Sequence, residues 1–498
     1  MINWFHNLPF FCIFIAMVAG MVTPFLRSRV AARAVHLTVL GVSLACSVVL
    51  LCYTLGTGES FTYMVGHYPA PWGNELRAGP LEAAMALMFS LVMLLSMLGN
   101  GRSLQADVED SRQPLYYVMM NMLFSSLLAL IYTNDLFTAY VFIEINTITA
   151  CAIVMAKNSK ETIRATLRYL IMSLLGSGLI LIAIALLYDL SGHLLMSPMH
   201  TALTQMAARG EYLLPLTVAV GLLTIGLSVK SALYPFHSWL PDAHASATTT
   251  SSSILSGLVV KGYILLLLKF YCRVLGLELF AQLGIANLLF VLGGLGMIMG
   301  SLNALRQKNI KRMIAFSSVA QVGYIFLGIG LQSPLALAAA CLHIIVHAVT
   351  KPMLFTAAGA LIDAAGHQKK LQALRGTAWQ QPVAGIAMLF GGFSMIGLPL
   401  LAGFSSKLAL AQAAFVGNRL VLPTLLLLGL SSILNALYYI PMLLVIYTPR
   451  EPGCKMQWRN SLSLQSAVLL VLVVCNVAVG VCYTPLMNIL KQGIALLG

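Results

Sequence analysis

The sequence predicts an all-α polytopic membrane protein with about fourteen transmembrane helices. Of its 498 residues, 59% are hydrophobic and only 9% are charged, and the mean hydropathy is +0.89. Soluble domains carry about 25% charged residues, so this composition excludes an ordinary soluble protein. The polar stretches between the apolar ones are short, and we expect them to be loops.

Apolar stretches of transmembrane length occur along the whole chain. A spanning helix needs about 20 predominantly apolar residues. The first stretch lacks a preceding basic segment, which favours a retained span over a cleaved signal peptide. The centres of the predicted spans lie near Ala16, Ala45, Leu91, Phe124, Thr147, Leu179, Ile225, Val260, Leu292, Tyr324, Ala348, Met395, Leu434 and Val474.

Lysine and arginine are unevenly divided between the two sets of loops. Alternate loops hold eighteen of them, namely Arg27, Arg29, Arg33, Arg102, Arg112, Lys157, Lys160, Arg164, Arg306, Lys308, Lys311, Arg312, Lys369, Lys370, Arg375, Arg450, Lys455 and Arg459. The opposite loops and ends hold six, namely Arg77, Arg209, Lys269, Arg273, Arg419 and Lys491. Basic residues favour cytoplasmic loops, so both termini are predicted outside. The net charge of +14 therefore reflects topology and not a nucleic-acid surface.

Five charged residues interrupt stretches that are otherwise apolar enough to span the membrane. They are Glu144, Lys230, Lys261, Lys351 and Lys407. An ionised side chain at mid-bilayer costs roughly 2.5 to 3.5 kcal/mol, so such residues face the protein interior and commonly mark ion pathways. Charge movement through the protein is the first hypothesis. The rival hypothesis is a scaffold subunit that seals a membrane arm and tolerates substitution at all five positions.

The seventh predicted span combines a lysine with helix-breaking residues. Lys230 is followed by Pro235, His237, Pro241 and His244. Proline removes a backbone hydrogen bond and clashes with the preceding turn, and membrane helices tolerate such breaks where they line a polar cavity. We therefore expect a discontinuous helix beside an ion path, with a plain helix end at Pro241 as the alternative.

The twelfth predicted span repeats this combination. Gly397, Pro399 and Gly403 precede Lys407. Paired interrupted helices in the two halves of a chain are typical of transporters built from internal repeats.

The eleventh predicted span carries two histidines and a lysine at four-residue spacing. His343, His347 and Lys351 share one helix face over about 12 Å. Imidazole accepts and donates protons near neutral pH, which suits a proton relay. Two alternatives are a metal site, for which no third ligand is recognisable, and hydrogen-bonded packing. Because Lys351 precedes Pro352, we expect it near a helix boundary and rank it below the other lysines.

Glu144 is the only acidic residue predicted deep inside a span. A nearby lysine would keep both groups charged and lower the cost of burying them, so we expect it to pair with Lys230. A static buried salt bridge is the alternative.

The sequence predicts no cofactor and no metal site within this chain. Its nine cysteines include no C-x-x-C pair, so an iron-sulfur or zinc site is not indicated. The segment 293–300 (GGLGMIMG) lies inside a predicted span without a preceding strand, which favours close helix packing over dinucleotide binding. Soluble redox chemistry would have to come from partner subunits.

Several motifs between about residues 134 and 408 resemble one family as a set. They are F-I-E-I around Glu144, K-S-A-L-Y-P-F-H-S-W-L-P-D-A-H from Lys230, V-V-K-G-Y around Lys261, N-I-K-R-M-I-A-F-S-S-V-A-Q-V-G-Y from Asn309, H-I-I-V-H-A-V-T-K-P-M-L-F from His343 and G-L-P-L-L-A-G-F-S-S-K ending at Lys407. The chain resembles the antiporter-like subunits of respiratory complex I, Mrp-type sodium/proton antiporters and membrane-bound hydrogenases. The N-terminal part, including Y-P-A-P-W-G at 68–73, favours the Mrp D-type and hydrogenase branch.

The resemblance implies two inverted five-helix repeats with discontinuous helices 7 and 12. The implied division is helices 1–3 in residues 1–110, the first repeat in 111–275, the second in 276–448 and helix 14 in 449–498. It also implies a proton translocation axis with Glu144 and Lys230 as the coupling pair, Lys261 as the central relay, the histidines between, and the exit at Lys407. The axis residues are Glu144, Lys230, Lys261, His343, His347 and Lys407, with His237, His244 and Lys351 ranked lower.

The resemblance further implies a proton-translocating, or sodium/proton, subunit of a multisubunit redox-driven complex. Its partners would be further antiporter-like and small transmembrane subunits and a peripheral redox module, in the cytoplasmic membrane of a bacterium or archaeon. The alternatives are a Mrp-type antiporter without a redox module and an ion-coupled subunit for inorganic-carbon uptake.

Overall fold

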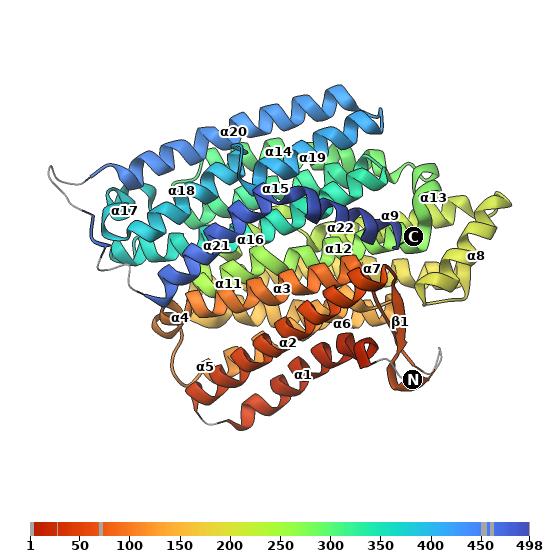
Figure 1. Ribbon diagram of the computed structural model, residues 1–498, viewed down its shortest axis with the longest axis horizontal. Coiled ribbons are helices and arrows are strands. Elements are labelled where there is room, and N and C mark those ends of the chain that lie inside the picture. The colour runs from red at the N-terminus through yellow and green to blue at the C-terminus, as the bar shows by residue number, and fades with distance from the viewer. Residues whose placement is uncertain (1–3, 27, 69–72, 450–455, 459–462, 498) are drawn as a thin grey trace.

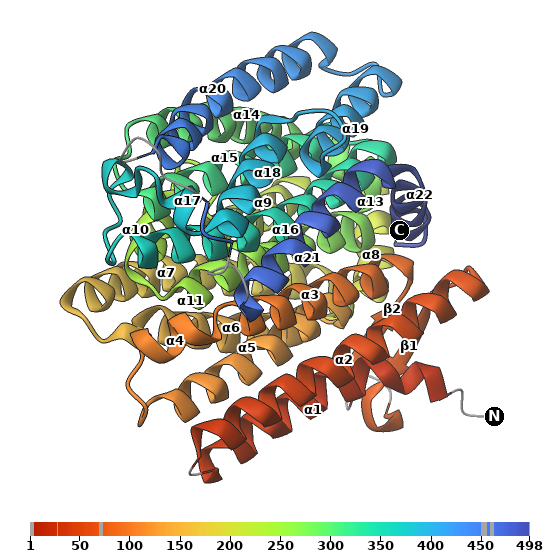
Figure 2. The same cartoon turned by 60° about the vertical axis from the view of Figure 1, so that its left-hand side comes forward.

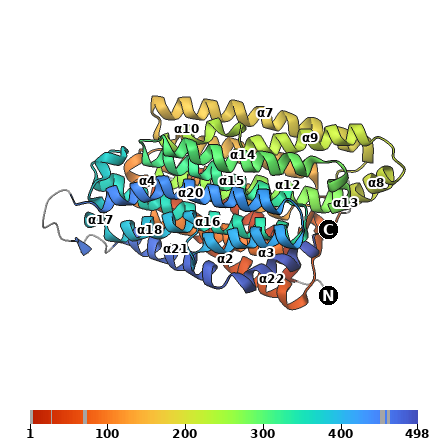
Figure 3. The same ribbon diagram turned by 90° about the horizontal axis from the view of Figure 1, so that it is seen from above.

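The computed structural model describes residues 4–26, 28–68, 73–449, 456–458 and 463–497. The described chain is a bundle of long helices that run side by side, with both termini at the same end (Figures 1 and 3). Arg27, residues 69–72 of the Y-P-A-P-W-G segment, Arg450, Lys455 and Arg459, which the sequence analysis used, lie outside the described residues.

The N-terminal part of the chain, residues 4–107, includes one edge of the bundle, which α1 and α2 form (Figure 2). Strands β1 and β2 pair antiparallel, with Phe61 opposite Ala78. The elements are η1 (Trp4–Asn7), α1 (Leu8–Val22), η2 (Thr23–Phe25), α2 (Arg29–Thr57), β1 (Phe61–Met64), η3 (Val65–His67), β2 (Glu75–Ala78), α3 (Pro80–Gly99) and α4 (Gly101–Asp107).

The middle of the chain carries the fourth to eighth predicted spans and the break in the seventh. Two turns within it, η6 and η7, are π-helical. The elements are α5 (Gln113–Tyr132), α6 (Leu136–Val154), η4 (Met155–Lys157), α7 (Lys160–Ser191), α8 (Met196–Ala208), α9 (Leu213–Lys230), η5 (Phe236–Ser238), α10 (Trp239–Ser246), α11 (Thr249–Ile254), η6 (Leu255–Val259), α12 (Val260–Phe270), η7 (Tyr271–Leu275) and α13 (Gly276–Gln282).

The C-terminal part supplies the innermost helices and the edge opposite α1 and α2 (Figure 2). Its elements are α14 (Ile285–Leu305), α15 (Ile310–Gly330), α16 (Pro334–Ala364), η8 (Leu371–Leu374), α17 (Thr377–Gln380), α18 (Pro382–Ile396), α19 (Ala402–Val416), α20 (Val421–Tyr447), α21 (Leu464–Val481) and α22 (Tyr483–Ala495).

Twelve helices in the described part of the chain are long and apolar enough to cross a membrane. The eighth and twelfth predicted spans correspond to segments that are divided into shorter helical pieces, residues 249–275 and 382–416. The prediction of an all-α polytopic membrane protein is therefore confirmed. Outer helices such as α7 and α20 expose large apolar side chains, among them Ile171 (59%) and Leu426 (62%), as expected of helices that face lipid.

The predicted breaks in the seventh and twelfth spans are both present. Helix α9 ends at Lys230, and regular α-helix resumes only at Trp239. Helix α18 ends at Ile396, where Gly397 adopts a φ of +99° that disfavours residues with a side chain, and α19 begins at Ala402. At the first break the carbonyl group of Val229 accepts a hydrogen bond from the Trp239 indole, and at the second the carbonyl groups of Met395 and Ile396 accept from Lys407.

Close packing of α14 on α15 depends on glycine, as the sequence predicts for the segment 293–300. A Cβ atom on Gly293 would lie 2.5 Å from the backbone nitrogen of Leu327, and one on Gly323 would lie 2.5 Å from the carbonyl oxygen of Gly293. Such contacts are too short for any side chain, so the two backbones meet directly. Helix α15 is thereby held in the interior, where its apolar segment is completely buried.

This packing predicts that Gly293→Val lowers the free energy of unfolding by about 1 to 3 kcal/mol, because the new side chain forces the two backbones apart. The measurement is denaturant unfolding of the purified protein in detergent micelles. The control is Gly178→Val on α7, where a Cβ atom meets nothing within 4 Å. Equal stability of the two variants would contradict the packing account.

Candidate functional site

The structure buries most of the predicted axis residues inside the bundle. Lys230, Lys261, His343 and His347 are 0% exposed, and so are His244 and Lys351 from the lower-ranked set. Lys407 is 8% exposed. The side chain of Glu144 differs, because 26% of it is exposed at the side of the bundle.

Glu144 and Lys230 form the predicted pair, in a loose geometry. Lys230 Nζ lies 3.7 Å from Glu144 Oε1, while it donates a 2.7 Å hydrogen bond to Thr147 Oγ1. The Glu144 carboxylate accepts a hydrogen bond from Ser177. Each charged group therefore has its own hydroxyl partner and would keep that hydrogen bond if the two groups moved apart.

The position of Lys230 depends on close contact between α7 and α9. A Cβ atom on Gly226 would lie 2.7 Å from the carbonyl oxygen of Gly176, so the two backbones meet at this point. A Cβ atom on Gly176 would itself meet the Lys230 side chain at 3.4 Å. These two glycines let the last turn of α9 carry its lysine across to α6.

Helix α12 connects this pair with the next lysine. Lys230 Nζ lies 5.7 Å from the centroid of the Tyr263 ring, and the Tyr263 hydroxyl donates to Asn146 Oδ1 at 2.8 Å. Lys261, two residues before Tyr263, donates to the backbone carbonyl of Ser256 in the π-helical turn η6. A π-helical turn disturbs the regular carbonyl pattern, which makes this oxygen accessible to a side chain.

Two adjacent serines of α15 link Lys261 with Lys351. Ser318 Oγ lies 2.9 Å from Ser256 Oγ, next to the Lys261 acceptor. Lys351 donates to Ser317 Oγ and, at 3.0 Å, to the carbonyl oxygen of Ile314. The hydroxyl pair 317–318 thus lies between the two lysines. Sequence reasoning quoted this S-S pair in a motif but gave it no role.

The prediction that Lys351 lies near a helix boundary is wrong. Helix α16 continues through Pro352 to Ala364. The proline ring fits against Gly257 of η6, where a Cβ atom would lie 2.6 Å from Pro352 Cγ. Membrane helices tolerate an internal proline when neighbouring groups accommodate it. Lys351 is therefore a central member of a row of ionisable groups. The row consists of Glu144, Lys230, Lys261, Lys351, His347, His343 and Lys407.

The α16 histidines lead from Lys351 toward α19. His343 pairs with Ser406 Oγ through Nδ1 at 2.9 Å and with Gln321 Oε1 through Nε2 at 3.1 Å. The ring of His347 lies 6.4 Å from that of His343, centroid to centroid. Neither nitrogen of His347 or of His244 has a protein hydrogen-bond partner among the described residues. Among the described residues, both imidazole rings are therefore buried with unused hydrogen-bonding capacity.

Lys407 lies at the break between α18 and α19. Its Nζ donates to the carbonyl oxygens of Met395 (2.9 Å) and Ile396 (2.8 Å) and to Ser432 Oγ (3.0 Å). It also lies 5.0 Å from the ring centroid of Tyr324, which stacks on His343. Carbonyl groups freed by the helix break therefore stabilise the ammonium group.

His237 occupies a separate position. It is half-buried in η5, with its ring 6.0 Å from that of Phe316. None of its described contacts reaches a lysine of the row. Among the described residues there is also no group of three or more His, Cys, Asp or Glu side chains able to hold a metal ion.

Two further buried lysines were wrongly assigned to loops by the sequence analysis. Lys269 is 0% exposed and donates to the carbonyl oxygens of Ile131 and Thr133, both at 2.6 Å. Lys311 is 2% exposed and donates to the carbonyl oxygen of Ala247 at 3.2 Å. Both ammonium groups satisfy the ends of helices, α5 and α10 respectively, where cations are favourable. Their long stems reach inward from positions that look peripheral in the sequence.

A buried ion pair also lies at the end of the bundle that holds the termini. Arg77 Nη1 lies 2.7 Å from Glu82 Oε1, with side-chain exposures of 4% and 2%. Arg77 also donates to the carbonyl oxygen of Leu496, which ties β2 to the C-terminal segment. Glu82 is a second buried acid that sequence reasoning missed, because it lies in the first turn of α3.

The fold and the row of buried ionisable groups together define a class of protein. It is a polytopic membrane protein with a lysine-rich polar interior between two broken helices. Residues 133–433 match the family described as "NADH:quinone oxidoreductase/Mrp antiporter, TM". The chain belongs to this family.

Relatives from more than one branch of the family are similar to the chain. It is 33% identical over 436 residues to the NADH-quinone oxidoreductase subunit N of Desulforudis audaxviator, covering 86% of this chain and 83% of that protein. It is 26% identical over 494 residues to the putative antiporter subunit mnhD2 of Staphylococcus aureus, covering 97% and 93% respectively.

Solved structures share the whole fold. A chain of the Mrp complex from a Dietzia species superposes with a TM-score of 0.87 at 21% identity, covering 100% of this chain and 98% of that one. A chain of the archaeal membrane-bound sulfane sulfur reductase superposes with a TM-score of 0.86 at 25% identity, covering 99% and 96%. Both are components of multisubunit membrane complexes.

The buried pair at the terminal end yields a prediction about stability. Arg77→Met leaves the Glu82 carboxylate buried without its partner, so we expect the free energy of unfolding to fall by about 3 to 5 kcal/mol. The matched control is Arg29→Met, which removes an ion pair to Asp110 whose side chains are 44% and 68% exposed. That change should cost less than about 1 kcal/mol. Denaturant unfolding in micelles measures both, and similar losses would contradict the assignment.

Proposed function

We propose that this chain translocates protons across the membrane along its buried polar row, as the ion-pumping subunit of a multisubunit redox-driven complex. The observation that carries the proposal is the sequence of ionisable groups from Glu144 to Lys407, held by hydroxyl and carbonyl partners inside an apolar bundle. Intramembrane ionisable residues are functional by default, because each is costly to bury.

The row passes across the bundle through successive helices. It leads from α6 and α9 through α12 to α15 and α16, and then to α19, along the contacts described above. Protons would move from Lys230 to Lys261 past Tyr263, and then through the serine pair to Lys351. The histidines of α16 carry them on to Lys407, where Ser406 joins the two helices.

Switching would begin at the loose pair. When Glu144 and Lys230 draw together, the carboxylate favours the protonated lysine; when they separate, the lysine releases its proton more readily. Glu144 is the member that reaches the lateral surface, so a neighbouring subunit is placed to act on it. The driver of the cycle then lies outside this chain, consistent with relatives that work in multisubunit complexes.

The chemistry of the row favours protons over sodium ions. Its members are mainly amines and imidazoles, which exchange protons, whereas a metal cation such as sodium requires several oxygen ligands around one point. Glu144 is the single carboxylate among the axis residues. Sodium/proton exchange, instead of proton translocation alone, is the alternative function within the same family.

We also propose the repeat organisation and the orientation. The two breaks at Lys230 and before Lys407 support inverted repeats at 111–275 and 276–448. The loops at the end opposite the termini include α4 and α17 (Figure 1), where basic residues gather. Both termini would then lie on the outer side of the cytoplasmic membrane of a bacterium or archaeon.

The switch predicts that Glu144→Gln and Lys230→Ala each reduce coupled proton translocation at least tenfold while the complex still assembles. Each variant removes one charge of the pair, so the affinity of the row for its proton no longer alternates. The measurement is proton uptake by inverted membrane vesicles containing the whole complex, with and without a sodium gradient.

The matched controls remove the same charges from exposed positions. Glu278 and Lys491 are exposed on the surface of the bundle. Glu278→Gln and Lys491→Ala should therefore leave the rate of translocation within about twofold of that of the unmodified protein. Undiminished translocation in both pair variants would instead favour a scaffold role for this subunit.

A further inference from the structure

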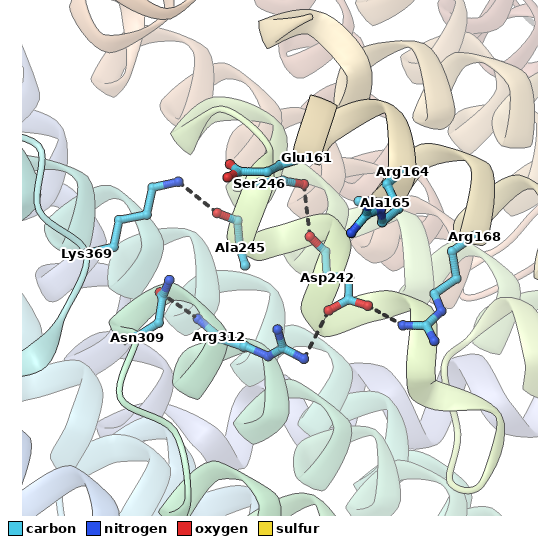
Figure 4. Close-up of a pocket in the computed structure, with 10 residues that line it drawn as sticks. All are labelled: Glu161, Arg164, Ala165, Arg168, Asp242, Ala245, Ser246, Asn309, Arg312 and Lys369. Atoms are coloured by element: carbon cyan, nitrogen blue, oxygen red, sulfur yellow. Dashed lines mark hydrogen bonds and ion pairs between the residues drawn. The ribbon is translucent and has the colours of Figure 1, made fainter. Parts of the chain in front are cut away.

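A polar pocket of about 750 Å³ opens between four parts of the chain and takes no part in the proton row. It is lined by the first turns of α7, the short helix α10, the start of α15 and the loop that follows α16 (Figure 4). Its volume falls within the range of small-ligand sites. Its charged side chains are Glu161, Arg164, Arg168, Asp242, Arg312 and Lys369.

Asp242 arranges two of the cations. Its carboxylate lies between the guanidinium groups of Arg168 and Arg312, as Figure 4 shows. The Arg312 Nη2 to Asp242 Oδ1 distance is 3.0 Å. One carboxylate thus holds two arginines toward a common space, and their remaining N–H groups stay available for an anion.

The other two cations lack an acidic partner. Arg164 forms no ion pair among the described residues, and Lys369 donates only to the carbonyl oxygen of Ala245, at 2.9 Å. Burial and repulsion from Lys157 lower the pKa of Lys369 below its usual value, against the attraction of Glu161. With four cations and two carboxylates, the lining carries two unmatched positive charges.

The pocket lies at the edge of the bundle, beside the first turns of α7. Helix α7 runs along this edge with α10 beside one end of it (Figure 3). Its 32 residues span about 48 Å, longer than the hydrocarbon core of about 30 Å, so its first turns reach the headgroup region. Leu167 (54% exposed) and Ile171 (59% exposed), one helical turn apart on α7, form an exposed apolar track beside Arg168.

We propose that this pocket binds the phosphate group of an anionic phospholipid, with the acyl chains lying along α7. Basic pockets between transmembrane helices on the cytoplasmic side suit acidic lipid headgroups. Arginine provides planar, bidentate donors to phosphate oxygens, and the lysine adds a point charge. Free inorganic phosphate offers the same chemistry without the apolar track.

The test is a binding titration of the purified, delipidated full-length chain by native mass spectrometry. Phosphatidylglycerol, phosphatidylcholine and inorganic phosphate are added separately. We expect phosphatidylglycerol to bind at least tenfold more tightly than phosphatidylcholine, whose ammonium group cancels the phosphate charge. Inorganic phosphate that competes with phosphatidylglycerol at equal concentration would identify free phosphate as the source, whereas failure to compete supports the lipid.

The decisive variant is Arg164→Gln with Lys369→Gln, which removes both unmatched charges and should weaken phosphatidylglycerol binding roughly tenfold to thirtyfold. Arg164 has no ion pair in the described structure. Arg164→Gln alone should weaken phosphatidylglycerol binding about threefold to fivefold.

The matched control is Arg306→Gln with Lys370→Gln, which removes two exposed positive charges outside the pocket, one of them adjacent to Lys369. Its affinity should stay within about twofold of that of the unmodified protein. Equal losses in the two double variants, unchanged affinity in Arg164→Gln with Lys369→Gln, or equal binding of the two lipids would overturn the proposal.

Discussion

The cost of holding charged amines away from water is the constraint on which this structure depends. Each buried lysine needs acceptors that an unbroken apolar helix does not offer. For Lys407 and Lys261 the chain supplies them where helices are interrupted, whereas Lys230 and Lys351 bind the hydroxyl groups of Thr147 and Ser317 within regular helices. Lys407 binds two carbonyl groups at the end of α18, and Lys261 binds one in the π-helical turn η6. Irregular turns that weaken individual helices therefore stabilise two of the charges, those of Lys261 and Lys407.

Enclosure of the row follows from the same constraint. Helices α15 and α16 are completely buried along their apolar segments, and glycine contacts with α14 hold α15 in place. The lysines thus lie at a distance from lipid behind outer helices such as α7 and α20. Glu144 is the exception, since it reaches the side of the bundle. An enclosed row with one accessible member is suited to control from a neighbouring subunit. Helix α10 joins this interior to the membrane surface, because it carries both His244 and Asp242 of the anion pocket.

Patterns that act locally in the sequence predicted the fold well. Apolar stretches predicted the spans, proline and glycine predicted both broken helices, and the isolated acid at Glu144 predicted its pairing with Lys230. Predictions that depended on the reach of long side chains were wrong. Lys269 and Lys311 look peripheral by position, yet their ammonium groups satisfy buried helix ends. Lys351 looked terminal because proline usually ends a helix, whereas Gly257, distant in the sequence, accommodates the ring.

The measurement that tests the central claim most directly is a double-mutant cycle at the pair, with proton translocation as the readout. Glu144→Asp and Lys230→Arg keep both charges but change the distance between them, so each should slow translocation without abolishing it. If the two residues act as one switch, the loss in the double variant will differ clearly from the product of the two single losses. Single losses that multiply would show two independent residues and contradict the account.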